Sequence, residues 1–167
     1  MAPAALIDEA QQAVGHGPAA ALGEGRAQRG DRVGADAGRL DLLVNNAAVI
    51  SDRLTDPAPF WRKPLELADV LDVGLRSAYV ASYHAAPLLL AGRAPLIVFT
   101  SSPGSVVYMH GPAYGAQKAG IDKFAHDMEH DLRGTGVIAV SIWMGPLVTE
   151  RSTIAREVNP EQYESFI

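Results

Sequence analysis

The sequence predicts an α/β fold in which parallel strands form a doubly wound sheet. Three short apolar runs of strand length, residues 40–50, 96–100 and 137–143, are each followed by small or polar residues, as buried parallel strands are. Two longer segments with helical spacing, 65–90 and 112–132, lie between these runs. The alternating order predicts right-handed strand–helix–strand units, with about three strands and two long helices.

Each predicted helix has one apolar face. In the first helix, 65–90, that face holds Leu67, Val70, Leu71, Leu75 and Tyr79. Pro87 is expected to kink or end this helix, because proline cannot donate a helical hydrogen bond. In the second helix, 112–132, the face holds Ile121, Phe124, Ala125, Met128 and Leu132. Gly134 and Gly136 are expected to stop the second helix.

The first 39 residues differ in composition from the rest of the chain. Between residues 15 and 39 the only large aliphatic side chains are Leu22 and Val33. We therefore expect residues 1–39 to be a poorly ordered segment that packs weakly against the strands. The folded part is expected to comprise residues 40–167.

Composition excludes several classes of protein. The chain has 167 residues, 48% of them hydrophobic, so it can bury a core. A formal net charge of -5 disfavours nucleic acid and anionic membranes as partners. With no cysteine, disulfides and thiolate chemistry are excluded. The sequence shows no secretory leader and no uninterrupted apolar run of about 20 residues, so we expect a cytoplasmic protein without a membrane span.

Tyr114-x-x-x-Lys118 is the motif that points to chemistry. Residues four apart lie on one face of a helix, and a positive charge beside a phenol favours its deprotonated form. Such a tyrosine could transfer a proton near neutral pH. Ser101, thirteen residues before Tyr114 at a predicted strand end, could hydrogen-bond a carbonyl or alkoxide oxygen.

Asn45-Asn46-Ala47-Ala48, Ser101-Ser102, Tyr114-x-x-x-Lys118 and Gly145-x-x-x-Thr149 together resemble the short-chain dehydrogenase/reductase family. The resemblance covers about residues 40–151. Residues 73–76 and 101–105 look most like the dehydrogenase/reductase member 1 branch. The resemblance implies part of a Rossmann-type sheet and hydride transfer between NAD or NADP and a small-molecule carbonyl or alcohol.

The resemblance also implies a role for each site residue. Tyr114 would donate or accept the proton, Lys118 would hold the nicotinamide ribose and tune Tyr114, and a serine would polarise the substrate oxygen. Ser101 has the usual spacing of thirteen residues to Tyr114, whereas Ser102 lies twelve away and follows the commoner second-serine position. Both serines are candidates, and Ser101 is preferred slightly.

Further residues match the cofactor-binding positions of the family. With Tyr114 and Lys118, this set consists of Asn45, Ala47, Gly145 and Thr149. Asn46 could equally be a simple strand-end hydrogen bonder. His126 and His130 fit an H-x-x-E-H pattern of some zinc peptidases, but the helical period points both away from the apolar face. We therefore expect them to face solvent, and we predict no metal site.

Two departures from the family put its activity in doubt here. The glycine-rich phosphate loop should precede Asn45, but the nearest glycine pattern among the preceding 44 residues, formed by Gly23, Gly25 and Gly30, does not follow a β-branched strand. Gly74 stands where most members have a catalytic asparagine. We expect an N-terminally truncated oxidoreductase whose function is impaired. The alternative is a non-catalytic remnant that dimerises through its two long helices or binds small ligands. The substrate, the choice between NAD and NADP, and the oligomeric state stay open.

Overall fold

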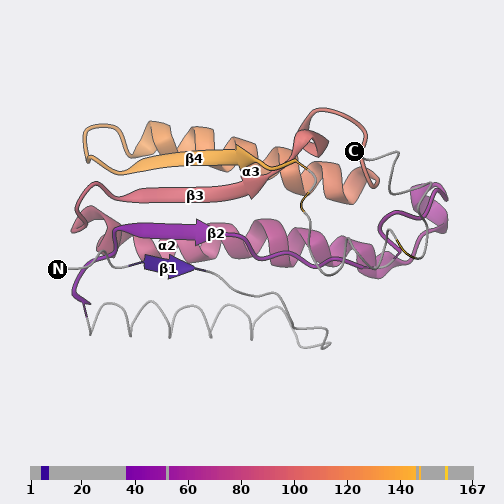
Figure 1. The fold of residues 1–167 in the computed structure, drawn as a ribbon, viewed down its shortest axis with the longest axis horizontal. Coiled ribbons are helices and arrows are strands. Elements are labelled where there is room, and N and C mark those ends of the chain that lie inside the picture. The colour runs from indigo at the N-terminus through magenta and orange to yellow at the C-terminus, as the bar shows by residue number, and fades with distance from the viewer. Residues whose placement is uncertain (1–4, 8–36, 52, 146, 148–156, 158–167) are drawn as a thin grey trace.

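Four parallel strands form one sheet in the computed structural model, which describes residues 5–7, 37–51, 53–145, 147 and 157. In spatial order they are β1 (Ala5–Ile7), β2 (Leu42–Asn45), β3 (Leu96–Ser101) and β4 (Ile138–Trp143) (Figure 1). Each strand pairs in parallel with the next. The predicted parallel arrangement of β2, β3 and β4 is confirmed.

Strand β1 is a difference from the sequence prediction. Leu6 and Ile7 lie in the segment predicted to pack weakly against the strands, but they pair with Leu43 and Val44 of β2. Residues 8–14 lie outside the described residues. A three-residue apolar run is too short for its period to separate strand from helix. The unpaired edge of β2 favours the extended form, because pairing satisfies backbone groups on both strands.

The predicted helix over residues 65–90 consists of three successive elements. A 3₁₀ turn, η2 (Leu65–Ala68), leads to the π-helical η3 (Leu71–Arg76), and α2 (Ser77–Leu90) follows. The π geometry is visible in the hydrogen bond from the Ser77 amide to the Asp72 carbonyl, five residues back. α2 continues past Pro87 and ends within one turn of it. The second long helix, α3 (Pro112–Asp131), has nearly its predicted bounds.

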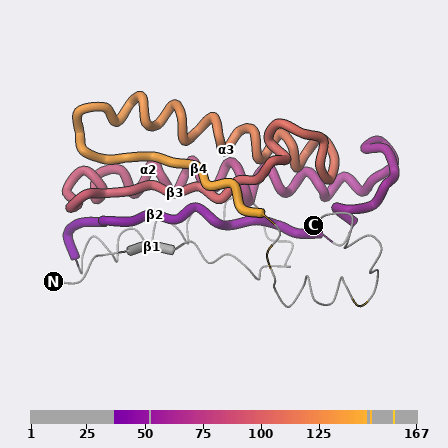
Figure 2. Tube along the Cα trace, turned by 45° about the horizontal axis from the view of Figure 1, so that its top comes forward, coloured from indigo at the N-terminus to yellow at the C-terminus, as the bar shows by residue number. Residues whose placement is uncertain are grey.

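Helices α2 and α3 lie against the same face of the sheet (Figure 2). Alternate strand residues point toward them, and the core contains Leu43, Phe99 and Ala139 from the strands with Leu89 and Ile121 from the helices. Phe99 is completely buried. Burying a side chain of this size stabilises the fold by about 1.5–3 kcal/mol.

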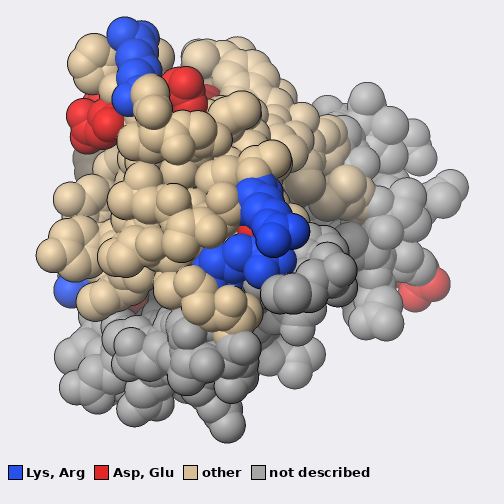
Figure 3. Space-filling view, turned by 90° about the vertical axis from the view of Figure 1, so that its left-hand side faces the viewer, with Lys and Arg blue, Asp and Glu red and all other residues tan. Residues whose placement is uncertain are grey.

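The carboxyl ends of the strands lie on the side of the molecule where the candidate site residues are found. The opposite end, where the strands begin, shows its described charged side chains in small groups separated by uncharged surface (Figure 3). Two short 3₁₀ turns occupy loops on the carboxyl side: η1 (Phe60–Arg62) after β2 and η4 (Pro103–Ser105) after β3. Within the described residues, no helix is both long and apolar enough to cross a membrane.

Candidate active site

Ser102 and Tyr114 meet at the carboxyl end of β3. The Ser102 hydroxyl lies 3.0 Å from the Tyr114 hydroxyl, and either oxygen could be the donor. Ser102 directly follows the strand and caps η4, because its Oγ accepts a hydrogen bond from the Gly104 amide at 3.2 Å. Its hydroxyl is therefore fixed by a backbone turn, which directs it toward the first turns of α3.

Lys118 lies next to this pair on the same face of α3. Its Nζ is 5.6 Å from the centre of the Tyr114 ring and donates a hydrogen bond to the Thr100 carbonyl at 3.2 Å. Burial lowers the pKa of Lys118, and the negative charge of Asp122 partly opposes that effect. The structure thus brings Ser102, Tyr114 and Lys118 together at one strand end.

Ser101 points elsewhere. It is the last residue of β3, and its Oγ donates to the Lys118 main-chain carbonyl at 3.4 Å. Successive residues of a strand point to opposite sides, so two adjacent serines cannot both face the tyrosine in an extended chain. The geometry favours Ser102 over Ser101, whereas spacing alone slightly favours Ser101.

Gly104 leaves the space that the Tyr114 ring occupies. A Cβ atom at position 104 would lie 2.6 Å from Cε1 of Tyr114. We expect Gly104→Ala to displace the tyrosine and to lower the free energy of unfolding by about 1–3 kcal/mol. Urea unfolding measures this loss. Gly115→Ala is the matched control, because its Cβ would meet the Gly104 carbonyl at an ordinary 3.4 Å and helix propensity favours alanine there. An equal loss in both variants would contradict the prediction.

The predicted cofactor-binding residues have different surroundings. Asn45 is buried at the end of β2, and its Nδ2 donates to the Ser82 hydroxyl of α2 at 3.1 Å. Its Oδ1 is buried with no hydrogen-bond partner among the described residues. Ala47 is half-buried just beyond the strand, and Gly145 is exposed after β4. Thr149 lies outside the described residues.

His110, which contacts Tyr114, was not predicted as a site residue. The His110 ring packs edge-on against Tyr114, with 5.0 Å between ring centres. Burial lowers the pKa of His110, and the charge of Lys63 lowers it further, so the imidazole is neutral at pH 7. The sequence offers no signal for His110, because it has no partner residue at a recognisable spacing.

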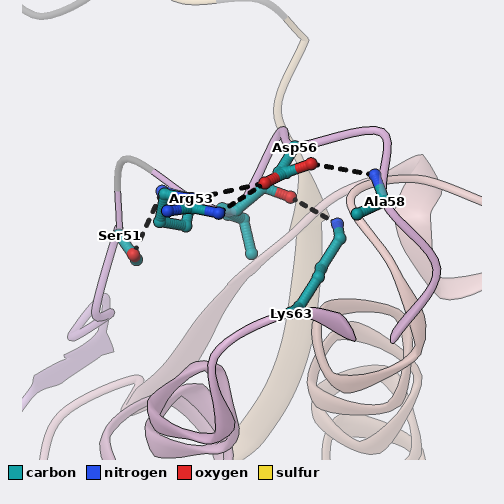
Figure 4. A network of polar contacts seen from close by, with 6 residues as sticks. Ser51, Arg53, Asp56, Ala58 and Lys63 are labelled. Carbon is teal, nitrogen blue, oxygen red and sulfur yellow. Dashed lines mark hydrogen bonds and ion pairs between the residues drawn. The ribbon is translucent and has the colours of Figure 1, made fainter. Parts of the chain in front are cut away.

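A polar loop holds Lys63. Its Nζ donates to the Leu54 carbonyl at 3.1 Å (Figure 4). In the same loop Arg53 pairs with Asp56 at 2.9 Å, and the other Asp56 oxygen accepts from the Ala58 amide at 2.9 Å. The Ala58 amide is the main cause of the lowered Asp56 pKa, with Arg53 adding to it. These bonds order the segment that leads from β2 to η1.

Gln117 connects the helix of the site to the π-helical turn. Gln117 lies between Tyr114 and Lys118 in the sequence, and its side chain is buried. Its Nε2 donates a hydrogen bond to the Gly74 carbonyl at 3.2 Å. A Cβ atom at position 74 would lie 2.8 Å from that Nε2. Glycine at position 74 therefore leaves the space that the Gln117 side chain occupies. The sequence alone could not indicate this contact, because 43 residues separate the two positions.

We expect Gly74→Ala and Gln117→Ala each to destabilise the fold by about 1–3 kcal/mol, the first by crowding and the second by removing a buried hydrogen bond. The double variant should lose less than the sum of the two, because the crowded side chain is gone. A double-mutant cycle by urea unfolding measures the difference, which should exceed about 0.5 kcal/mol. Simple additivity would show that the two positions do not interact.

His126 and His130 are exposed on α3, as the helical period predicts. His126 hydrogen-bonds Asp127 at 3.0 Å. Among the residues that the structure describes, no group of three or more histidine, aspartate or glutamate side chains could hold a metal ion.

Comparison with known proteins agrees with this geometry. The family model described as short chain dehydrogenase matches residues 24–160. Human dehydrogenase/reductase SDR family member 1 is 45% identical over 116 residues, which cover 68% of this chain and 37% of that protein. Tropinone reductase-like 1 of Erythroxylum coca is 31% identical over 131 residues, covering 78% of this chain and 48% of that protein. The chain thus spans less than half the length of these relatives.

A solved structure supports the fold. Aldohexose dehydrogenase of Thermoplasma acidophilum, in ligand-free form, superposes with a TM-score of 0.73 at 22% identity, covering 87% of this chain and 57% of that chain. At this identity the likeness concerns the fold alone, which is the predicted partial Rossmann-type sheet. From the sheet, the Ser102, Tyr114 and Lys118 arrangement and the match over residues 24–160, we conclude that the chain belongs to the short-chain dehydrogenase family.

Proposed function

We propose that the chain carries the catalytic half of an oxidoreductase that transfers a hydride between NAD or NADP and a small-molecule carbonyl or alcohol. The observation that carries this proposal is the contact of 3.0 Å between the Ser102 and Tyr114 hydroxyls, with the Lys118 amine beside the tyrosine ring. In the proposed site Ser102 is the polarising serine, and Ser101 supports the helix that bears Lys118.

The geometry suits proton transfer to a substrate oxygen. A carbonyl oxygen placed between the two hydroxyls would accept a hydrogen bond from Ser102 and the proton from Tyr114. The carbonyl carbon takes the hydride, which the nicotinamide supplies when bound, and its oxygen takes the proton of Tyr114. The resulting phenolate lies beside the Lys118 ammonium, which stabilises it electrostatically. Alcohol oxidation is the same sequence in reverse.

The described residues fit the nicotinamide end of the cofactor. Lys118 and Tyr114 offer donors for ribose hydroxyls at the strand ends, and the orphaned Oδ1 of Asn45 offers an acceptor. Gly145 and Thr149 follow β4 at positions that the family uses for the nicotinamide carboxamide. The pyrophosphate end lacks a counterpart, because no glycine-rich loop after a strand can be identified before Asn45. This is why we propose that activity is impaired in the chain by itself.

A non-catalytic role is the second candidate. Gly74, at the position of the family's catalytic asparagine, and the missing phosphate loop favour it. The Gly74 carbonyl accepts a hydrogen bond from Gln117, so this backbone group already has a partner. In this role the chain would bind small ligands or dimerise without turning over a carbonyl.

A fusion protein separates the two candidates. The part of the human relative that precedes the equivalent of Leu40 is joined ahead of residue 40 of this chain. NADH and NADPH oxidation is then measured with a panel of ketones and aldehydes. Turnover by the fusion that requires Tyr114 would support the oxidoreductase. A folded fusion that binds the cofactor but gives no turnover would support the non-catalytic role.

Dimerisation through α2 and α3 is part of the proposal. Tyr79 and Tyr83 of α2 are 51% and 68% exposed, and Leu90 is 54% exposed, which leaves apolar surface on this helix. Analytical ultracentrifugation tests it: Tyr83→Asp should shift a dimer toward monomer, and a monomeric parent chain would contradict it. The cytoplasmic location stays a prediction from the sequence.

A further inference from the structure

Asp122 lies on α3 one turn after Lys118 and is surrounded by hydrogen-bond donors from other elements. Its Oδ2 accepts from the Trp143 indole Nε1, at the end of β4, at 2.9 Å. Its Oδ1 is buried, as is the Ser105 hydroxyl of η4, and neither has a hydrogen-bond partner within the described residues. Asp122 therefore lies where β4, η4 and α3 come together.

The hydroxyl and indole groups around Asp122 lower the pKa of its carboxyl. Burial by itself raises the pKa of Asp122, but the hydroxyls of Ser105, Ser101 and Ser141 and the Trp143 indole outweigh it. The pKa is lowered below its ordinary value as a result, so the group is an anion at neutral pH. The bond from Trp143, together with the buried Asp122 Oδ1 and Ser105 hydroxyl that have no other partner among the described residues, favours one arrangement of β4, η4 and α3.

Two of these donors belong to the turn that carries Ser102. Ser101 comes directly before Ser102 in the chain. Ser105 lies three residues after Ser102 and ends η4, the turn that Ser102 caps. The single hydroxyl hydrogen of Ser101 is donated to the Lys118 carbonyl at 3.4 Å, which joins this turn to α3 directly. On the other side, the charge of Asp122 acts on the Lys118 amine and favours its protonated form. Among the described titratable groups, Tyr114 and Asp122 are the two that lie against Lys118.

We propose that Asp122 is a positioning residue for the proposed reaction: its carboxylate ties the Ser101–Ser105 turn and the end of β4 to the part of α3 that carries Lys118. It touches neither the substrate oxygen nor the reacting atoms. It holds Ser102 against Tyr114 and keeps Lys118 an ammonium ion. The proposal rests on the proposed function, but its main readouts do not require turnover.

The test compares Asp122→Asn and Asp122→Ala with Asp127→Asn in the 167-residue chain. Asparagine keeps the size and an acceptor for the Trp143 indole but removes the charge. Asp127 is the matched control, because it lies on the same helix and pairs with the exposed Lys123. The chain has only three lysines, Lys63, Lys118 and Lys123, so isotope-labelled lysine gives resolved NMR signals for each amine.

We expect Asp122→Asn to lower the pKa of the Lys118 amine, and Asp127→Asn to leave it unchanged. Asp122→Ala should also raise hydrogen exchange of the Gly104 amide, which bonds to Ser102, by about tenfold. Should Asp122→Ala fail to fold, Asp122→Asn carries the test through the Lys118 titration. An unchanged Lys118 pKa in Asp122→Asn would overturn the proposal, and so would an equal change in Asp127→Asn.

Kinetics of the fusion protein add a separate readout. There Asp122→Asn should lower kcat with little change in KM and should shift the alkaline limb of the pH profile, whereas Asp127→Asn should change neither. A fusion that folds and binds cofactor without turnover would count against the proposed function, and the Lys118 titration would still decide the role of Asp122. Unaltered kcat and pH profile in an active Asp122→Asn fusion would overturn the positioning role.

Discussion

The isolated 167-residue chain is expected to bind NADH and NADPH no more tightly than about 1 mM, and to reduce ketones at no measurable rate. Catalysis needs the hydride donor held against the substrate, and fixing two reactants in this way is worth roughly 7–11 kcal/mol. Much of that anchoring comes from a pyrophosphate at a glycine-rich helix start. Tyr114 and Lys118 can contact only the nicotinamide end.

Calorimetric titration of the folded chain tests this expectation. The matched ligand is nicotinamide mononucleotide, which lacks the adenine half. If the chain supplies no site for that half, the mononucleotide and the dinucleotide should bind within about threefold of each other, a difference well below 1.4 kcal/mol. Micromolar affinity for NADH or NADPH, or NADPH oxidation that depends on Tyr114, would show that another segment of the chain provides the phosphate site.

Tyr114→Phe is expected to lower kcat of the fusion protein by about 10²- to 10⁴-fold, because general acid catalysis from a placed group has this magnitude. The phenyl ring keeps the packing against His110 and removes only the hydroxyl that faces Ser102. Cofactor affinity should change much less, since Lys118 and the phosphate loop are retained. Steady-state kinetics and calorimetric titration measure the two quantities separately.

The two serines provide an internal comparison for this prediction. Ser102→Ala should lower kcat strongly, whereas Ser101→Ala removes a bond to the Lys118 carbonyl and should have a smaller effect. A larger loss in Ser101→Ala would mean that spacing along the chain is the better guide to the polarising serine. Full activity of Tyr114→Phe would exclude this tyrosine as the proton donor.

The secondary structure around the site follows from local sequence. Short runs of branched apolar residues that end in small or polar residues predict strands at residues 96–100 and 137–143. The structure has β3 and β4 at these positions. The apolar spacing in 112–132 likewise predicts α3 to within one residue. The Tyr114 and Lys118 pair also follows directly, since residues four apart on a helix must share a face.

The structure departs from sequence expectation where a neighbour decides the conformation. Leu6 and Ile7 become a strand because the β2 edge is available for pairing. The π-helical turn at Leu71–Arg76 has no periodic signature, and its Gly74 carbonyl is satisfied by a side chain from another helix. Neither feature can be derived from a short window of sequence, because the stabilising partner is distant along the chain.

Local sequence patterns are enough to indicate the family, the parallel sheet and the residue types of the candidate site. The packing of the elements settles which serine meets Tyr114, what Gln117 contacts and which donors surround Asp122. Spacing constrains residues within one element, but a hydroxyl at a strand end can point to either side, and the pKa of a carboxyl depends on donors that other elements supply. Those choices depend on how β3, β4 and α3 pack together, which no local pattern specifies.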